Sequence, residues 1–278
     1  MRPGLAMLQS GTRVVLNRVG LDGRVMRLLD GWRARRAAKR STLRLGPDGL
    51  PVPPDELIEQ VHGPTGASAG EFLRGGETGR RIIAETLARH GVAVEELGVL
   101  LDFGVGCGRV ARYWVDLDTD VHGCDYNPGL VEWCQENLPH VTAVTNRLDP
   151  PLPYDDGRFD LVYSLSVFTH LTEALQRPWS AELRRVTRSG GHVLFTVIGP
   201  TFPHPDPGFL TPEIAERLER GELIVLTPEH AGRNCCAALH PRSWVEDNML
   251  DGFELVEYVE RGAGMSGGQD IFLVRRVD

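Results

Sequence analysis

Between residues 98 and 198, short apolar runs alternate with longer segments in which apolar residues recur every three or four positions. The short runs are typical of buried strands, and the longer spacing is typical of helices that cover a sheet. Strands are therefore expected at 98–103, 120–125, 141–145, 159–164 and 191–198. Helices are expected at 77–90, 109–115, 128–138 and 172–187. Strands that alternate with helices predict right-handed βαβ units, a parallel sheet and an α/β fold.

After residue 199 the alternation stops. Residues 201–240 are rich in proline and show no further parallel unit, and a short helix (243–250) and two strands (253–259 and 270–276) follow them. Long loops at the carboxyl edge of a parallel sheet carry specificity, so residues 200–245 are expected to form a substrate cap. The aromatic residues of this cap suit a small, partly apolar metabolite: Phe202, Phe209 and Trp244.

The first of these strands ends in an acid, and three alternating glycines follow: Asp102, then Gly104, Gly106 and Gly108. Glycine lacks a Cβ, so such a turn lets a ligand approach the backbone. Residues 106–111 also satisfy the dinucleotide fingerprint, with Asp125 at the distance expected of a ribose-binding acid, and this alternative indicates an NAD-linked oxidoreductase. A carboxylate beside the loop suits a ligand with an ammonium group better than one with a pyrophosphate.

The longer string, from Asp102 to Gly108, resembles that of the class I S-adenosylmethionine-dependent methyltransferases. The resemblance continues in the same order over residues 122–127, 146–153, 159–164 and 183–195, and it covers roughly residues 66 to 199. It implies a doubly wound, mostly parallel seven-stranded Rossmann-like sheet with an antiparallel C-terminal hairpin. It also implies S-adenosylmethionine as the cofactor and methyl transfer as the activity.

The resemblance assigns a role to each matching residue. The three glycines would approach the methionine part and the ribose, Asp102 would face the methionine ammonium, and Asp125 would accept hydrogen bonds from both ribose hydroxyls. The remaining candidates are Tyr126 stacked beside the adenine, Asn146, Arg147 and Leu148 at its edge, and Ser164 beneath the methionine carbons. The alternative for each is structural: a helix cap for Asp102, a strand end for Asp125, or packing for Tyr126.

A general base is needed only where the methyl acceptor arrives protonated, as an alcohol does. His170 follows the fourth strand and is the candidate base, with helix capping as its alternative role, and His204 is a weaker candidate. His230, Cys235, Cys236 and His240 lie close in sequence, but adjacent cysteines rarely share one ion, so no metal is expected. The acceptor is expected to be a small molecule of a secondary-metabolite or sugar-modifying pathway. A non-catalytic S-adenosylmethionine-binding subunit is a further alternative.

Charge is divided unevenly along the 278 residues. Residues 1–45 contain eleven basic and two acidic residues, a net charge of +9, while the whole chain carries −8. The remaining residues are therefore strongly acidic and would repel a long nucleic acid. We expect a basic arm and connector at 1–50 and a methyltransferase domain at 51–278.

Within the arm, apolar residues recur at helical spacing among arginines: Val25, Leu28, Leu29 and Trp32. An amphipathic helix is expected that packs on the protein's own acidic body or on a partner subunit, which would give a homo-oligomer. No apolar run is long enough to span a bilayer, and no secretory signal is recognised. The five scattered cysteines do not form a disulfide framework, so a cytoplasmic protein is expected.

Overall fold

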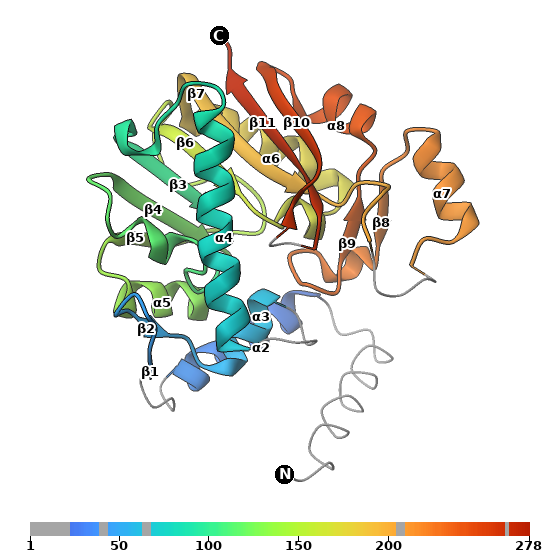
Figure 1. Ribbon diagram of the computed structural model, residues 1–278. Coiled ribbons are helices and arrows are strands. Elements are labelled where there is room, and N and C mark those ends of the chain that lie inside the picture. Colours follow the sequence, from blue (N-terminus) through green and yellow to red (C-terminus); the bar gives the residue numbers. More distant parts are fainter. Residues whose placement is uncertain (1–22, 39–43, 63–67, 204–208, 265–266) are drawn as a thin grey trace, which may run out of the picture.

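Figure 1 shows the computed structural model, which describes residues 23–38, 44–62, 68–203, 209–264 and 267–278. Its centre is a seven-stranded sheet in the order β10-β11-β7-β6-β3-β4-β5. The five parallel strands are β3 (Val99–Phe103), β4 (Asp120–Asp125), β5 (Val141–Thr145), β6 (Phe159–Ser164) and β7 (Thr187–Val197). The last two strands, β10 (Phe253–Ala263) and β11 (Gln269–Arg276), form an antiparallel pair, and β11 lies between β7 and β10 and runs antiparallel to both. The predicted fold is confirmed.

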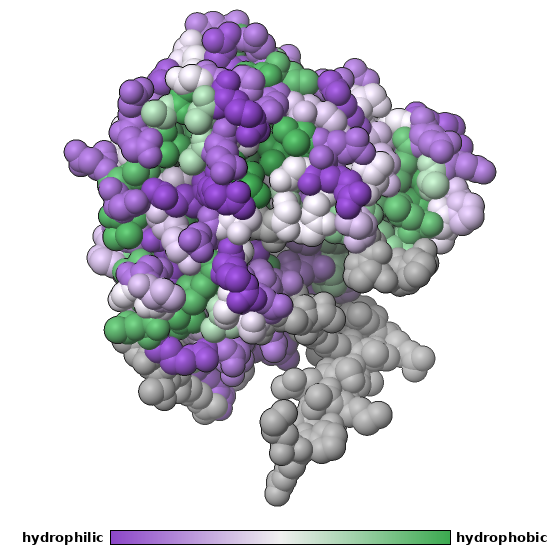
Figure 2. Space-filling view, viewed as in Figure 1, coloured by the Kyte–Doolittle hydropathy of each residue, from purple (hydrophilic) through white to green (hydrophobic). Residues whose placement is uncertain are grey.

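Helices cover both faces of this sheet (Figure 1). Because side chains alternate along a strand, Leu100 joins the core beneath α4 (Ala69–Ala88) and α5 (Pro128–Asn137). Its neighbour Leu101 joins the opposite core, beneath α6 (Glu173–Val186) and α8 (Arg242–Met249). The outward side of α4 is largely hydrophilic (Figure 2), as expected for a helix that covers one face of a sheet. The sheet therefore lies between two layers of helices, with one hydrophobic core on each of its faces.

Two helix predictions differ from the structure. Helix α4 begins at Ala69 rather than residue 77, because Ser68 and Glu71 form a reciprocal capping box at its start. The helix expected at 109–115 is only a short 3-10 turn, Ala111–Trp114. This segment is pressed against α4, since a Cβ at Gly76 would lie 1.9 Å from the Arg109 carbonyl oxygen. The glycine loop therefore leads into a tight turn and not into a regular helix.

The arm forms the expected helix, α2 (Gly23–Ala38), but packs through an unexpected face. Its buried side chains include Met26 and Ala34, whereas Leu28 is 75% exposed and Trp32 is 56% exposed. Small residues determine which face of α2 is buried, because a Cβ at Gly129 of α5 would lie only 2.5 Å from the Ala34 Cβ. The helix thus packs on the body by close backbone approach of α2 to α5, while Leu28 and Trp32 stay exposed, so that packing of the apolar stripe on a partner subunit stays a prediction.

The cap expected at 200–245 contains α7 (Pro212–Glu219) and a small antiparallel pair, β8 (Ile224–Leu226) with β9 (Ala237–Leu239). Phe202 and Phe209 pack against this pair, and Trp244 belongs to the main core, so none of the three lines the cavity described below. The structure therefore does not bring these aromatic residues to the cavity wall. His204 lies outside the described residues. Among the described helices, none is both long and apolar enough to cross a membrane.

Candidate active site

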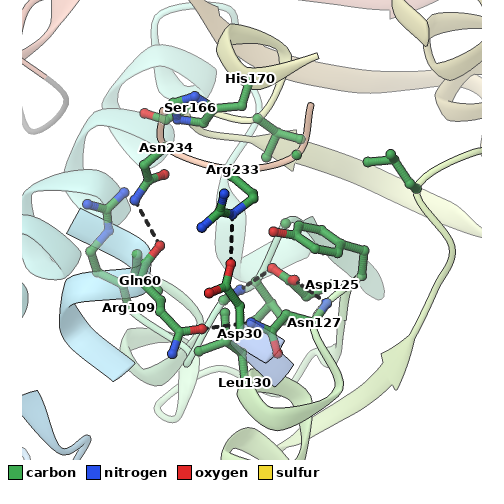
Figure 3. A pocket seen from close by; sticks show the side chains of 18 of the residues that line it. Asp30, Gln60, Arg109, Asp125, Asn127, Leu130, Ser166, His170, Arg233 and Asn234 are labelled. Carbon is green, nitrogen blue, oxygen red and sulfur yellow. Dashed lines mark hydrogen bonds and ion pairs between the residues drawn. The ribbon is translucent and has the colours of Figure 1, made fainter. Parts of the chain in front are cut away.

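A cavity of about 1130 Å³ lies at the carboxyl ends of β3, β4 and β6. Its wall is built from the loops that follow these strands, from α2, from α3 (Asp55–His62) and from residues 230–235 (Figure 3). The carboxyl edge of a parallel sheet, where the connections leave toward opposite faces, is the usual ligand site of this architecture. The strand order places the ends of β3, β4 and β5 side by side, so their terminal residues follow one another along the cavity.

The glycine loop is held close to its neighbours. Gly104 and Gly106 line the cavity with φ of 87° and 56°, a region that favours glycine. A Cβ at Gly104 would lie 2.2 Å from Cγ2 of Val167, so no larger residue fits there. Gly108 does not line the cavity, and a Cβ there would meet Leu138 of the segment after α5 at 2.2 Å. The close approach at Gly108 is therefore to the protein's own core.

Asp125 ends β4 with both carboxylate oxygens fixed (Figure 3). The backbone N–H of Gly106 donates to Oδ2 at 3.1 Å, and that of Asn127 donates to Oδ1 at 2.8 Å. Burial raises the pKa of Asp125 to about 6, although these two hydrogen bonds act to lower it. The carboxylate lines the cavity beside the glycine loop, where its paired oxygens suit a vicinal diol.

Asp102, the penultimate residue of β3, lies on the same side and is 5% exposed. Tyr163 of β6 donates a hydrogen bond to its Oδ2 at 2.8 Å. Burial raises the pKa of Asp102 to about 7, while this hydrogen bond and the nearby Arg109 guanidinium act to lower it. Near neutral pH this carboxylate is therefore readily protonated, and a cation bound beside it would favour its ionised form.

Arg109 also lines the cavity, and the sequence analysis did not single it out. Its Nη1 donates to Nδ1 of His62 at 3.1 Å, and among the described residues it makes no ion pair with a carboxylate. Burial lowers the pKa of Arg109, and the charge of Asp102 acts against this. A cation and an anion side by side suit a zwitterion. The sequence signal was an arginine directly after the third glycine.

The residues expected at the adenine lie at the far end of this row. Tyr126 and Leu148 line the cavity, and Gly232 lies against both, since its Cβ would be 2.8 Å from Leu148 and 3.3 Å from the Tyr126 ring. Trp179 of α6, which the sequence analysis missed, donates from Nε1 to the Leu148 carbonyl at 2.9 Å and so fixes this loop. An apolar slot between Tyr126 and Leu148 suits an aromatic base.

Two further predicted residues, Asn146 and Arg147, lie at the rim of this slot. Asn146 donates from Nδ2 to the Arg147 carbonyl at 2.6 Å, and its Oδ1 is buried without a partner among the described residues. The Arg147 side chain is exposed and pairs with Asp149 at 3.3 Å. Of the two, Asn146 therefore keeps an unused acceptor at the cavity.

His170 lies in a 3-10 turn after β6, Phe168–His170, and lines the cavity (Figure 3). A carbonyl oxygen only accepts, so the contact of 2.6 Å between Nδ1 and the Cys236 carbonyl places the proton of neutral imidazole on Nδ1. Burial lowers the pKa of His170, which leaves Nε2 as an unprotonated acceptor near neutral pH. Ser164, in contrast, is fully buried and does not line the cavity.

The segment Ala231–Asn234, which we call the lid loop, closes the cavity from above. Arg233 pairs with Asp30 of α2 at 2.7 Å, and Arg27 donates to the Ala231 carbonyl at 3.1 Å. Asn234 donates to the Gln60 carbonyl of α3 at 2.8 Å (Figure 3). The Gly232 N–H donates to the His170 carbonyl at 2.7 Å. The lid loop therefore ties both N-terminal helices to the sheet.

The cavity wall also includes residues that precede Asp102 in the sequence. Met26 and Asp30 of α2 and Gln60 and Val61 of α3 all belong to the cavity wall. The reason is that α2 packs on the start of α5, beside the end of β4. The predicted division at residue 50 thus does not separate the cavity from the arm. Within the described ranges, no group of three or more His, Cys, Asp or Glu side chains is arranged to hold a metal ion.

Comparison with known proteins gives three kinds of match. Residues 101–195 match the protein-family profile described as "Methyltransferase domain". An uncharacterized methyltransferase of Anoxybacillus flavithermus is 32% identical over 104 residues, which are 37% of this chain and 48% of that protein. A glycine/sarcosine/dimethylglycine N-methyltransferase of Actinopolyspora halophila is 30% identical over 190 residues, 57% of this chain and 32% of that protein. The chain thus spans less than half of either relative.

A similar solved structure is the 1,6-didemethyltoxoflavin-N1-methyltransferase of Burkholderia thailandensis with bound 1,6-didemethyltoxoflavin and S-adenosylhomocysteine. The TM-score is 0.50 at 17% identity, over 73% of this chain and 80% of that one. At this identity the likeness concerns the fold alone.

Proposed function

We propose that the chain, whose residues 101–195 match a methyltransferase domain profile, is a class I S-adenosylmethionine-dependent methyltransferase that transfers a methyl group from this cofactor to a small molecule. The order of chemistry along the cavity carries the proposal. Asp102 and Arg109 offer opposite charges at the end of β3, Asp125 offers a carboxylate at the end of β4, and Leu148 follows β5. S-adenosylmethionine presents a zwitterionic amino acid, a ribose diol and an aromatic base in that order.

The same order argues against NAD. In a dinucleotide site, the loop after the first strand receives a pyrophosphate. Here the Asp102 carboxylate stands beside that loop. Its negative charge would repel a doubly charged pyrophosphate and would attract an ammonium group, whereas Asp125 suits the ribose diol of either cofactor.

The bound cofactor supplies an activated sulfonium methyl group. The protein would hold the amino acid between Asp102 and Arg109 and the ribose on Asp125, and the lid loop would exclude water. Orientation of this kind provides much of the rate in methyl transfer. Where the acceptor is a hydroxyl group, Nε2 of His170 would take its proton as the new bond forms.

A small acceptor fits the enclosed cavity better than a polymer does. The lid loop and α2 close over the cavity, and the acidic body would repel nucleic acid. We place the protein in the cytoplasm, in agreement with its five free cysteines, Cys107, Cys124, Cys134, Cys235 and Cys236. The exposed Leu28 and Trp32 support the proposal that copies associate through the arm. A secondary-metabolite or sugar-modifying pathway stays a prediction.

Calorimetry with purified protein tests the proposal. We expect binding of S-adenosylmethionine and S-adenosylhomocysteine and none of NAD. Asp125→Ala removes the diol acceptor and should weaken binding of both cofactor forms by about 10- to 100-fold. Asp251→Ala is the matched control, because the Asp251 side chain is 98% exposed on the loop after α8. Tight NAD binding, or equal affinity in the Asp125 and Asp251 variants, would overturn the proposal.

A further inference from the structure

Three side chains form a hydrogen-bonded chain beneath the cavity. Trp114 lies in the short turn after the glycine loop, Tyr163 lies on β6, and Asp102 is the penultimate residue of β3. Trp114 Nε1 is 2.9 Å from the Tyr163 hydroxyl oxygen, which is 2.8 Å from Oδ2 of Asp102. Trp114 and Tyr163 are fully buried, and only Asp102 reaches the cavity wall. The chain thus links the core of the protein to one acidic group of the site.

The direction of each hydrogen bond in this chain is fixed. An indole N–H can only donate, so the Tyr163 oxygen accepts from Trp114. The hydroxyl proton of Tyr163 must then point to Asp102, which receives it on Oδ2. A donor aimed at a carboxyl oxygen favours the ionised form of that carboxyl group. Trp114 therefore sets the orientation of Tyr163, and Tyr163 favours the charge on Asp102.

The charged and titratable groups near Asp102 lie on the glycine loop, β4, β6 and α5. Arg109 of the glycine loop favours its charge, whereas Asp125 of β4 opposes it. The Tyr163 hydroxyl stays neutral, because burial raises its pKa well above the ordinary value, and burial does the same for the Cys134 thiol of α5. The other oxygen of Asp102, Oδ1, makes no hydrogen bond among the described residues. It is the oxygen left for a ligand.

We propose that Tyr163, aligned by Trp114, is a positioning residue that keeps Asp102 charged and turned toward the ammonium group of the cofactor. The inference rests on the proposed function, since it needs a ligand with an α-amino group. Tyr163 itself does not touch the cavity. Its role is to offset the burial that would otherwise leave Asp102 protonated near neutral pH.

Tyr163→Phe tests the proposal with two ligands. S-adenosylhomocysteine has the amino-acid group, and 5′-methylthioadenosine lacks it. Without the hydroxyl donor the pKa of Asp102 should rise by about one unit, the size of one hydrogen bond to a charged group. The ratio of variant to wild-type Kd for S-adenosylhomocysteine should then be about tenfold near pH 6 and close to one near pH 9. For 5′-methylthioadenosine the ratio should stay close to one throughout.

The ligand's own amino group titrates in the same way with both proteins, so the ratio isolates the protein's contribution. In an Asp102→Asn background, Tyr163→Phe should lose its pH-dependent effect. Trp114→Phe keeps the Tyr163 hydroxyl but frees its direction, and it should give a smaller shift of the same sign. This variant serves where Tyr163→Phe does not fold.

A Kd ratio that is the same at every pH, or equal for both ligands, would mean that Tyr163 only packs, and it would overturn this inference alone. A wild-type protein that binds neither S-adenosylmethionine nor S-adenosylhomocysteine at any pH would overturn the proposed function as well.

Discussion

The imidazole of His170 is held in a single tautomer by a backbone carbonyl. Because Nδ1 donates to Cys236, Nε2 is the nitrogen that can accept a proton, and burial lowers the pKa of the ring. Such a ring is uncharged at neutral pH, as a general base must be. The Cys236 carbonyl that orients it lies just before β9, two residues after the lid loop. His170 is thus held by this carbonyl and also accepts a hydrogen bond from Gly232 of the lid loop through its own carbonyl.

We expect His170→Ala to lower turnover of a hydroxyl acceptor by about 10²- to 10⁴-fold, with cofactor affinity nearly unchanged. The base acts when deprotonated, so wild-type activity should fall as the pH falls through a pKa below the ordinary value of 6.5. That acid limb should be absent from the variant. His192→Ala, on β7 and outside the cavity wall, is the matched control. Preserved turnover per folded molecule would instead assign His170 a structural role.

At this scale, residues at strand ends could be predicted and residues from distant helices could not. Asp102, Asp125 and Tyr126 line the cavity because β3 and β4 deliver their ends to it. Ser164 also ends a strand, but its side chain falls on the buried side, a register that the motif alone does not reveal. Asp30 and Trp179 carry no local signal, since only the tertiary fold brings them to the cavity.

At the scale of elements, the lid loop and α2 act as a pair. The Arg233–Asp30 ion pair is short and mostly shielded, with side-chain exposures of 12% and 15%. In a pair shielded in this way, removal of one partner leaves the other charge poorly compensated, which costs more than removal of one partner from a surface pair. Opening of the lid loop must break this pair. Cofactor exchange should therefore depend on it.

Arg233→Met should accelerate dissociation of S-adenosylhomocysteine by about tenfold, the size of one charge-assisted hydrogen bond. Stopped-flow fluorescence of ligand release measures this rate. Arg242→Met breaks an exposed pair with Glu246 and serves as the control. Asp30→Asn should act in the same direction as Arg233→Met. Unchanged release in both variants would show that the lid loop does not limit exchange.

The sequence predicted the existence of most elements better than their packing faces. For α2, periodicity identified a helix but did not show which of its faces contacts the body. The small residues Gly31 and Ala34 allow closer backbone contact than leucine or tryptophan would, and close packing decided the face. For residues 109–115, close packing against α4 at Gly76 leaves only one 3-10 turn where a helix was predicted. Neither effect is visible in hydrophobicity alone.

At the scale of the whole molecule, the arm belongs to the site. Removal of residues 1–38 takes away Met26 and Asp30 and also the anchors of the lid loop. We therefore expect the truncated protein to bind S-adenosylhomocysteine at least about tenfold more weakly and to unfold at a lower temperature. Calorimetry and thermal unfolding measure the two effects. The sequence motifs alone do not indicate this contribution of the arm, because all of their residues follow position 101.

Removal of residues 1–22 alone is the matched control, because it keeps every described residue of the cavity wall. Wild-type affinity in a folded protein that lacks residues 1–38 would contradict the role of α2.

The overall sheet was predictable because its strands and helices follow one another locally. The closure of the cavity was not, since Arg27 and Ala231 meet across 204 positions.

The place of β11 also bears on how the protein is made. This strand follows β10 in the chain but lies inside the sheet, between β7 and β10. While a ribosome has not yet passed residue 276, β7 has an unpaired edge and β10 has no place on the sheet. The unpaired edge of such a nascent chain can pair with strands of other nascent chains on the same messenger RNA. Chaperones that shield exposed strands should therefore matter most during the synthesis of the segment that contains β10 and β11.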